Sequence, residues 1–331
     1  MDSGMNWNKL ADRILDGGTV SRDEALAVLQ SPNEEILCVL QAAYRIRKKY
    51  YGNKVSLHVL KNAKSGVCPE DCAFCSQSKS AESGVEKYAM QSADEIVAGA
   101  GEAKAMQALR YCVVTSTRAP SENEMSVICE AARRIKAENP ALELCASMGF
   151  LTEEKARRLK EAGVNRFNHN LETSERFYPS ICSTHKFQDR VNTAKIVKQA
   201  GLDLCCGGLI GMGESLEDRV DLALKLKELD TDSAPINFLD PRPGTGMEGK
   251  ARLTPNDCLR ALAMFRFVLV GSEVRVAGGR ETCLRDLQPL ALYPANSMFT
   301  NGYLTTGGQN FEQDKKMIED AGFEIGHLVN A

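Results

Sequence analysis

Residues 66–77, GVCPEDCAFCSQ, hold three cysteines in the spacing C-x3-C-x2-C. The glycine and proline of this stretch predict a loop. A structural zinc ion takes four protein ligands in a closed tetrahedron, and no fourth Cys or His follows at zinc spacing. A cubane iron–sulfur cluster held by three thiolates instead leaves one iron open to a reactive ligand. The loop therefore favours a 4Fe-4S cluster on Cys68, Cys72 and Cys75, with a zinc site completed by a distant residue as the alternative.

The elements that must position this loop follow a regular alternation. Short β-prone runs recur, and each is followed by a charged stretch of helical periodicity. The runs cover residues 55–60, 109–114, 142–147, 164–168, 202–206, 235–240, 274–277 and 296–299. Helical segments between them include residues 122–139, 152–162, 187–200, 215–229 and 254–270. Eight strands alternating with helices predict an α/β fold, a (β/α)8 barrel of the TIM type, with reactive groups at the carboxyl ends of its strands.

The first fifty residues have the pattern of helices, including a capping box formed by Ser21 and Glu24. We expect residues 1–50 to be a helical extension of a barrel domain that covers residues 51–331. The basic cluster at residues 45–49 is typical of cations near the carboxyl end of a helix, with a phosphate-binding patch as the alternative.

Polar and sulfur side chains occur in or directly after most of the predicted strands. They are Cys112, Cys145, Asn168, Asn170, Cys205, Asn237 and Arg275. An unpaired amide, guanidinium or thiol in a strand is costly to bury, so the mouth of one barrel is the place that accommodates all of them. For each cysteine taken alone, the alternative is a small buried apolar residue.

The composition limits the classes of function. The chain has 331 residues, 43% hydrophobic and 26% charged, with a net charge of -3. These values describe an ordinary globular protein and argue against a nucleic-acid partner. The absence of a signal-peptide pattern and of a long apolar run predicts a cytoplasmic protein without membrane association. In that reducing compartment, twelve cysteines favour cluster ligation over disulfides.

From about residue 50 onward the chain resembles the biotin synthase family of radical S-adenosylmethionine (SAM) enzymes. The resemblance rests on GVCPEDCAFCSQ, LRYCVVTS, LELCASMG, LDLCCGGL, FNHNLETS, GGLIGMGE, PINFL, VRVAGGRE and GYLTT. The three-cysteine loop alone would indicate only the radical SAM superfamily. The strand cysteines together with Arg275 narrow it to this family.

The resemblance implies the conversion of dethiobiotin to biotin, in which adenosyl radicals remove two hydrogen atoms and one sulfur atom is inserted. The fourth iron of the 4Fe-4S cluster would chelate SAM. An auxiliary cluster of the 2Fe-2S type would donate the sulfur, and its ligands would be Cys112, Cys145, Cys205 and Arg275. An external electron donor such as flavodoxin or ferredoxin, and a homodimer, are also implied.

The same resemblance assigns residues to the two small molecules. SAM would be bound by Asn170, Glu172, Arg190, Gly207 and Gly208. Dethiobiotin would be bound by Asn168, Asn170, Asn237, Thr305 and Thr306. The family usually has Asp at the position of Glu172. Alternatives that remain are a tight turn for the glycines, a solvated helix face for Arg190 and a plain turn for the threonines.

Two adjacent thiols, Cys205 and Cys206, occur where relatives have one followed by Ser. Neighbouring residues of a strand face opposite sides, so we expect Cys205 to face the barrel interior and Cys206 to pack under the helices. If the strand turned here, both sulfurs would reach the mouth and a four-iron auxiliary cluster would become feasible. The other cysteines are expected to be packing residues, and they are Cys38, Cys129, Cys182, Cys258 and Cys283.

Two other functions compete with this interpretation. A radical SAM barrel enzyme of the hydrogenase-maturation or methylornithine-forming type would not need three strand cysteines and Arg275. A non-enzymatic iron–sulfur carrier would leave the paired asparagines and the glycine-rich turn unexplained.

Overall fold

A closed parallel barrel forms the centre of the computed structural model, which describes residues 4–66 and 68–327. Its strands are β1 (Lys54–Lys64), β2 (Arg110–Thr115), β3 (Glu143–Ser147), β4 (Arg166–Asn168), β5 (Asp203–Cys205), β6 (Gly208–Ile210), β7 (Ser233–Phe238), β8 (Glu273–Val276) and β9 (Ser297–Phe299). They pair in chain order, and β9 pairs with β1 to close the ring. A further short strand, β10 (Glu324–Ile325), adds to β1. Residues 1–3, the start of the predicted helical extension, and residues 328–331, the end of the predicted barrel domain, lie outside the described residues.

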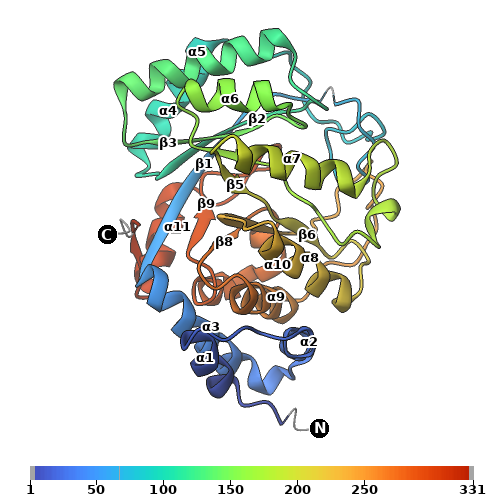
Figure 1. Ribbon diagram of the computed structural model, residues 1–331, viewed down its shortest axis with the longest axis vertical. Coiled ribbons are helices and arrows are strands. Elements are labelled where there is room, and N and C mark those ends of the chain that lie inside the picture. Colours follow the sequence, from blue (N-terminus) through green and yellow to red (C-terminus); the bar gives the residue numbers. More distant parts are fainter. Residues whose placement is uncertain (1–3, 67, 328–331) are drawn as a thin grey trace.

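Helices surround the barrel (Figure 1). They are α4 (Ala93–Ala105), α5 (Glu122–Glu138), α6 (Glu153–Glu161), α7 (Phe187–Gln199), α8 (Leu216–Glu228), α9 (Pro255–Val268), α10 (Arg280–Leu284) and α11 (Phe311–Asp320), with 3-10 turns η1 (Asn33–Glu35), η2 (Tyr178–Ser180) and η3 (Arg285–Leu292). Each of the eight predicted strands overlaps an observed one, and the five predicted helices are present. The predicted (β/α)8 barrel is confirmed. Among the described residues, none of the helices has the length and apolar character that crossing a membrane requires.

One barrel position is filled by two short strands, β5 and β6, where the sequence predicted a single strand followed by a turn. β5 pairs with β4, and β6 pairs with β7. The backbones are very close at the break: a Cβ on Gly207 would lie 1.9 Å from the carbonyl oxygen of Pro235, and one on Gly208 would lie 2.5 Å from that of Glu172. Glycine is therefore required here by contact between neighbouring strands.

Three helices at the N-terminus lie on the outer side of α9 (Figure 1). They are α1 (Trp7–Leu15), α2 (Arg22–Gln30) and α3 (Ile36–Tyr51), and both α2 and α3 pack on α9. Their apolar residues join the same hydrophobic core as the barrel. The predicted helices and the capping box of Ser21 and Glu24 are confirmed.

The basic cluster of α3 contains one fully buried side chain, Arg47. Its guanidinium donates to the backbone carbonyls of Gly52, Lys54 (2.7 Å) and Ala295 (3.3 Å), and it lies over the ring of Phe323. Burial lowers the pKa of Arg47 to about 9, which still leaves the side chain charged at neutral pH. Arg47 thus joins α3 to the barrel and is not part of an exposed phosphate-binding patch.

We expect Arg47→Met to lower the free energy of unfolding by about 2–4 kcal/mol, because three carbonyl groups would lose a charged donor in a buried place. Urea denaturation of the cluster-free protein measures this. The matched control is Arg45→Met, which removes a more exposed side chain bound to Asp12 and should cost less than about 1 kcal/mol. Equal losses for the two variants would contradict the structural role of Arg47.

Candidate active site at the mouth of the barrel

A cavity of about 370 Å³ opens at the carboxyl ends of the strands. Most of the residues predicted to form the site line it: Cys68, Cys72, Cys75, Cys112, Cys145, Asn168, Asn170, Glu172, Arg190, Asn237, Arg275, Thr305 and Thr306. Cys205 lies deeper and is fully buried. Gly207 and Gly208 do not line the cavity, and their missing side chains allow the close strand packing described above.

The three-cysteine loop is held in place by backbone hydrogen bonds. The amide of Cys75 donates to the carbonyl of Cys72 (3.0 Å), and the amide of Gly66 donates to the Gln77 side chain (3.0 Å). Burial raises the pKa of Cys68, and it raises the pKa of Cys75 to about 11. Three thiols on the wall of one cavity fit a cluster that has three protein ligands and one open iron.

Two acidic residues between these cysteines, Glu70 and Asp71, attach the loop to residues 181–185. Glu70 accepts hydrogen bonds from Arg118 (2.7 Å) and Thr184, and it lies 2.6 Å from His185 Nδ1. Asp71 accepts from the backbone amides of residues 183 and 184. Although burial opposes it, the hydrogen bonds of Thr184 and His185 lower the pKa of Glu70. Sequence reasoning missed this role, for which the only signal was a pair of carboxylates between the cysteines of the loop.

Arg190 of α7 is turned into the protein and is not solvated. It donates to the Asn170 carbonyl (2.9 Å) and to the Tyr178 hydroxyl, and its guanidinium lies 3.8 Å from the Glu172 carboxylate. Tyr178 in turn is 2.7 Å from His185 Nε2. Burial raises the pKa of Glu172. A chain of contacts therefore joins the cluster loop, through His185 and Tyr178, to the predicted SAM residues.

Deeper in the barrel, thiols from three strands meet one guanidinium. Cys112 and Cys145 are direct neighbours on β2 and β3. Cys205 of β5 lies 3.5 Å from Arg275 Nη1 and 3.2 Å from the side-chain amide of Asn168. Burial raises the pKa of Cys205. Arg275 Nε is buried without a hydrogen-bond partner in the described structure. Three thiols with a guanidinium beside them fit the surroundings of a small iron–sulfur cluster.

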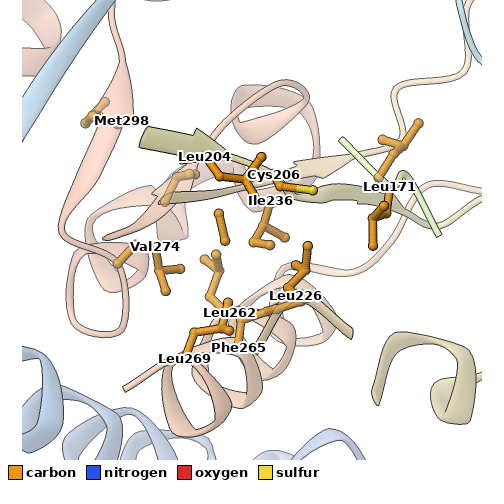
Figure 2. Packing of buried hydrophobic residues seen from close by; sticks show 14 of the residues in the cluster. Leu171, Leu204, Cys206, Leu226, Ile236, Leu262, Phe265, Leu269, Val274 and Met298 are labelled. Carbon is orange, nitrogen blue, oxygen red and sulfur yellow. The ribbon is translucent and has the colours of Figure 1, made fainter. Parts of the chain in front are cut away.

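The side chain of Cys206 points to the opposite side of the strand from that of Cys205, as expected. It is fully buried in the apolar layer between the strands and the helices. Figure 2 shows it on the strand side of this layer, across from Leu226 of α8 and from Leu262 and Phe265 of α9. The four-iron alternative needs both sulfurs at the mouth, and this arrangement places only Cys205 on the inner side.

One expectation for the remaining cysteines was wrong. Cys38 is exposed, so it is not a packing residue. Cys182 is buried in the hydrophobic core, as expected, but it also lies 3.9 Å from Cys72 and has polar groups beside it. Its role is considered below.

Beneath the inner cysteines, the carboxylate of Glu273 gathers six polar side chains. Its partners are Arg110, Arg166, Arg275, His58, Ser233 and Ser297. Burial alone would raise the pKa of Glu273, but Arg110 and Arg275 hold it well below its usual value. Sequence reasoning noticed Arg275 as a guanidinium in a strand. It missed Arg110 and Arg166, although they are also arginines within predicted strands.

The predicted dethiobiotin residues lie at two levels of the cavity. Asn237 donates to the Gly208 carbonyl (3.1 Å) and accepts from the Gly278 amide (2.9 Å), so it ties together the ends of β6, β7 and β8. Thr305 is exposed at the rim, and Thr306 donates to the Tyr303 carbonyl (2.8 Å). Asn237 therefore supports the backbone of the site.

We expect Glu273→Gln to lower the free energy of unfolding by about 3–5 kcal/mol, because three buried guanidinium groups would lose their shared counter-charge. Chemical denaturation at neutral pH measures the loss. Glu143→Gln is the matched control, since that carboxylate also contacts Arg110 but is partly exposed, and it should cost about 1 kcal/mol or less. A Glu273→Gln protein as stable as the control would contradict the central role of this carboxylate.

Comparisons with known proteins agree with this geometry. A profile of the radical SAM superfamily matches residues 62–226, and one of the biotin and thiamin synthesis associated domain matches residues 235–324. Biotin synthase of Salinibacter ruber is 52% identical over 318 residues, which cover 96% of this chain and 88% of that protein. Biotin synthase of Bacillus subtilis is 47% identical over 319 residues, with 96% and 95% covered.

Two solved structures share the fold at low identity. Methylornithine synthase has a TM-score of 0.83 at 19% identity, covering 96% of this chain and 97% of that one. The FeFe-hydrogenase maturase from Carboxydothermus hydrogenoformans has a TM-score of 0.81 at 18% identity, covering 98% and 80%. These structures establish the barrel architecture, whereas the identity of about one half over nearly the full chain establishes the family. The chain belongs to the biotin synthase family of radical SAM enzymes.

Proposed function

We propose that this protein converts dethiobiotin to biotin by SAM-dependent radical chemistry and sulfur insertion. The observation that carries the proposal is that a three-cysteine loop and a second set of thiols with Arg275 meet at one cavity at the barrel mouth. Radical formation and sulfur donation can then act on one substrate without its release. Membership of the family supports the same reaction.

Cys68, Cys72 and Cys75 would hold the 4Fe-4S cluster, and Cys112, Cys145, Cys205 and Arg275 an auxiliary 2Fe-2S cluster. When bound, the first supplies the electron that cleaves SAM to the 5′-deoxyadenosyl radical, and the second supplies the sulfur atom. Such chemistry is beyond any side chain, so the contribution of this chain is to bind, orient and shield the reactants.

The side chains around the first site suit SAM. Arg190 is a largely buried cation on the cavity wall that has one carboxylate, Glu172, within 4 Å, so a second carboxylate from the methionine part of SAM would find a charged donor there. Asn170 and Glu172 would contact the ribose and amino groups. Gly207 and Gly208 would contribute indirectly, because their close backbone packing brings Asn170 and Glu172 to the cavity wall.

For dethiobiotin, the asparagines and the threonines would bind opposite ends of the molecule. Asn168, Asn170 and Asn237 present amide groups that can pair with the ureido ring deep in the cavity. Thr305 and Thr306 lie at the rim, where the substrate carboxylate would remain partly hydrated. The ring would thereby be held near the inner thiols while the charged end faces outward.

We further propose an external one-electron donor, such as flavodoxin or ferredoxin, because each cleavage of SAM consumes one electron. We also propose a homodimer in the cytoplasm, in which residues 1–50 are a helical extension of the barrel domain formed by residues 51–331.

The first test is product formation by anaerobically reconstituted protein. With dithionite, SAM and dethiobiotin, we expect 5′-deoxyadenosine and biotin by mass spectrometry from the wild type. Cys75→Ser should form neither product, because the cubane would lose one of its three thiolates. Cys129→Ser, which changes a cysteine of α5, should keep both. Deoxyadenosine without biotin from the wild type would refute the proposed substrate, and its formation by Cys75→Ser would refute the cluster assignment.

The second test concerns the auxiliary site. We expect Arg275→Ala to change the Mössbauer spectrum or iron content of the auxiliary cluster, because a guanidinium beside Cys205 is removed. Cys206→Ser, one residue along the chain, should leave both unchanged, since its sulfur lies in the apolar layer. Loss of auxiliary iron in Cys206→Ser, or more than two auxiliary irons per wild-type chain, would show that the cluster has another type or ligand set.

A further inference from the structure

A second group of metal-ligating side chains lies behind the three-cysteine loop. It consists of Cys72, Cys182 and His185, whose ligand atoms all lie within 4.8 Å of one another. The sulfurs of Cys72 and Cys182 are 3.9 Å apart, and Cys182 Sγ is 3.3 Å from His185 Nδ1. The three residues are more than nine-tenths buried. Cys72 and His185 line the cavity and Cys182 does not, so the group shares one thiol with the three-cysteine loop and extends from the cavity wall into the protein.

The spacing matches the edges of a tetrahedral zinc site. Zn–S bonds of about 2.3 Å and Zn–N bonds of about 2.0–2.1 Å place two sulfurs about 3.8 Å apart, and a sulfur and a nitrogen about 3.5 Å apart. The two measured separations, 3.9 and 3.3 Å, are close to these values. The third separation, between Cys72 Sγ and a ring nitrogen of His185, is at most 4.8 Å.

The charges around the group also suit a divalent cation. Two thiolates would balance its charge, and the histidine would bind as the neutral ring. Asp71 Oδ1 lies 3.2 Å from Cys182 Sγ, where its negative charge would favour a cation, and the fourth position of the tetrahedron would be open to water. If His185 binds through Nδ1, its other ring nitrogen, Nε2, keeps the Tyr178 hydroxyl at 2.7 Å as the partner that orients the ring. Glu70 Oε2, 2.6 Å from Nδ1, would then have to give up this contact to the ion.

We propose that the cluster-free protein binds one thiophilic divalent cation, such as Zn²⁺, through Cys72, Cys182 and His185. Binding of this ion requires neither SAM nor an iron–sulfur cluster. Its consequence for the enzyme rests on the proposed function, since Cys72 is also a ligand of the proposed 4Fe-4S cluster. One cysteine cannot serve both sites as arranged here, so the cation and the cluster exclude each other.

Cobalt(II) serves as the spectroscopic probe, added anaerobically to full-length cluster-free protein in the presence of a phosphine reductant. We expect the wild type to develop thiolate-to-cobalt charge-transfer bands and intense visible bands of tetrahedral Co²⁺, which Zn²⁺ abolishes. Cys182→Ser and His185→Gln should each weaken the tightest binding at least tenfold. Cys75→Ser, which removes a cavity thiol outside the group, should bind as the wild type does. Any Co²⁺ bound at Cys112, Cys145 and Cys205 contributes to the spectra of the wild type and of all three variants. It therefore cancels when a variant's spectrum is subtracted from that of the wild type.

The expected result separates the two sites. Cys182→Ser should lose the tight cobalt binding of this site and still assemble the 4Fe-4S cluster, which also proves that it folds. Cys75→Ser should keep the tight cobalt binding and fail to assemble the cluster. One equivalent of Zn²⁺ should slow cluster assembly in the wild type and not in Cys182→Ser. Unchanged cobalt binding in both Cys182→Ser and His185→Gln, or its loss in Cys75→Ser, would overturn the proposal. A wild type that forms no biotin would refute the proposed function and leave these spectra unaffected.

Discussion

The interior of the barrel depends on the ion pairs that the buried carboxylate of Glu273 forms with three arginines. Three guanidinium groups, from Arg110, Arg166 and Arg275, point into the same closed ring of strands, and isolated cations there would be very costly to bury. Glu273 offsets their charge and also accepts from two serines. Because the carboxylate holds one nitrogen of Arg275, another nitrogen of the same guanidinium is directed at Cys205. The geometry of the inner thiol site therefore follows from an ion network one layer below it.

The outer thiol site, formed by Cys68, Cys72 and Cys75, is also held in place by residues around it. The three cysteines lie in a loop without regular secondary structure, so their positions depend on what the loop contacts. Glu70 and Asp71 provide this by binding the segment of residues 181–185, and Tyr178 extends the connection to Arg190. The thiols that would hold the cluster and the cation that would hold the carboxylate of SAM are thus parts of one hydrogen-bonded unit. This unit also brings Cys182 to Cys72, which creates the candidate cation site.

The break between β5 and β6 shows how backbone packing decides the direction of side chains. β5 ends at Cys205, and the chain can pass between β4 and β7 only because Gly207 and Gly208 have no side chains. Cys205 then faces the barrel interior and Cys206 faces the helices. The amide of Gly207 also binds the Asn170 side chain (3.1 Å), which holds one of the proposed ligand residues at the cavity.

The sequence by itself determined the architecture and most of the residues at the mouth. Alternation of β-prone runs with capped helices is a local signal, and parallel closure necessarily brings the strand ends together. The three-cysteine spacing, and the thiols and Arg275 in strands, were recognisable for the same reason. Only the tertiary structure decided the partners. Glu273 meets Arg110 across 163 residues, and Cys182 meets Cys72 across 110. No periodicity or spacing records such contacts, because they arise from barrel closure and loop docking between elements that are distant along the chain.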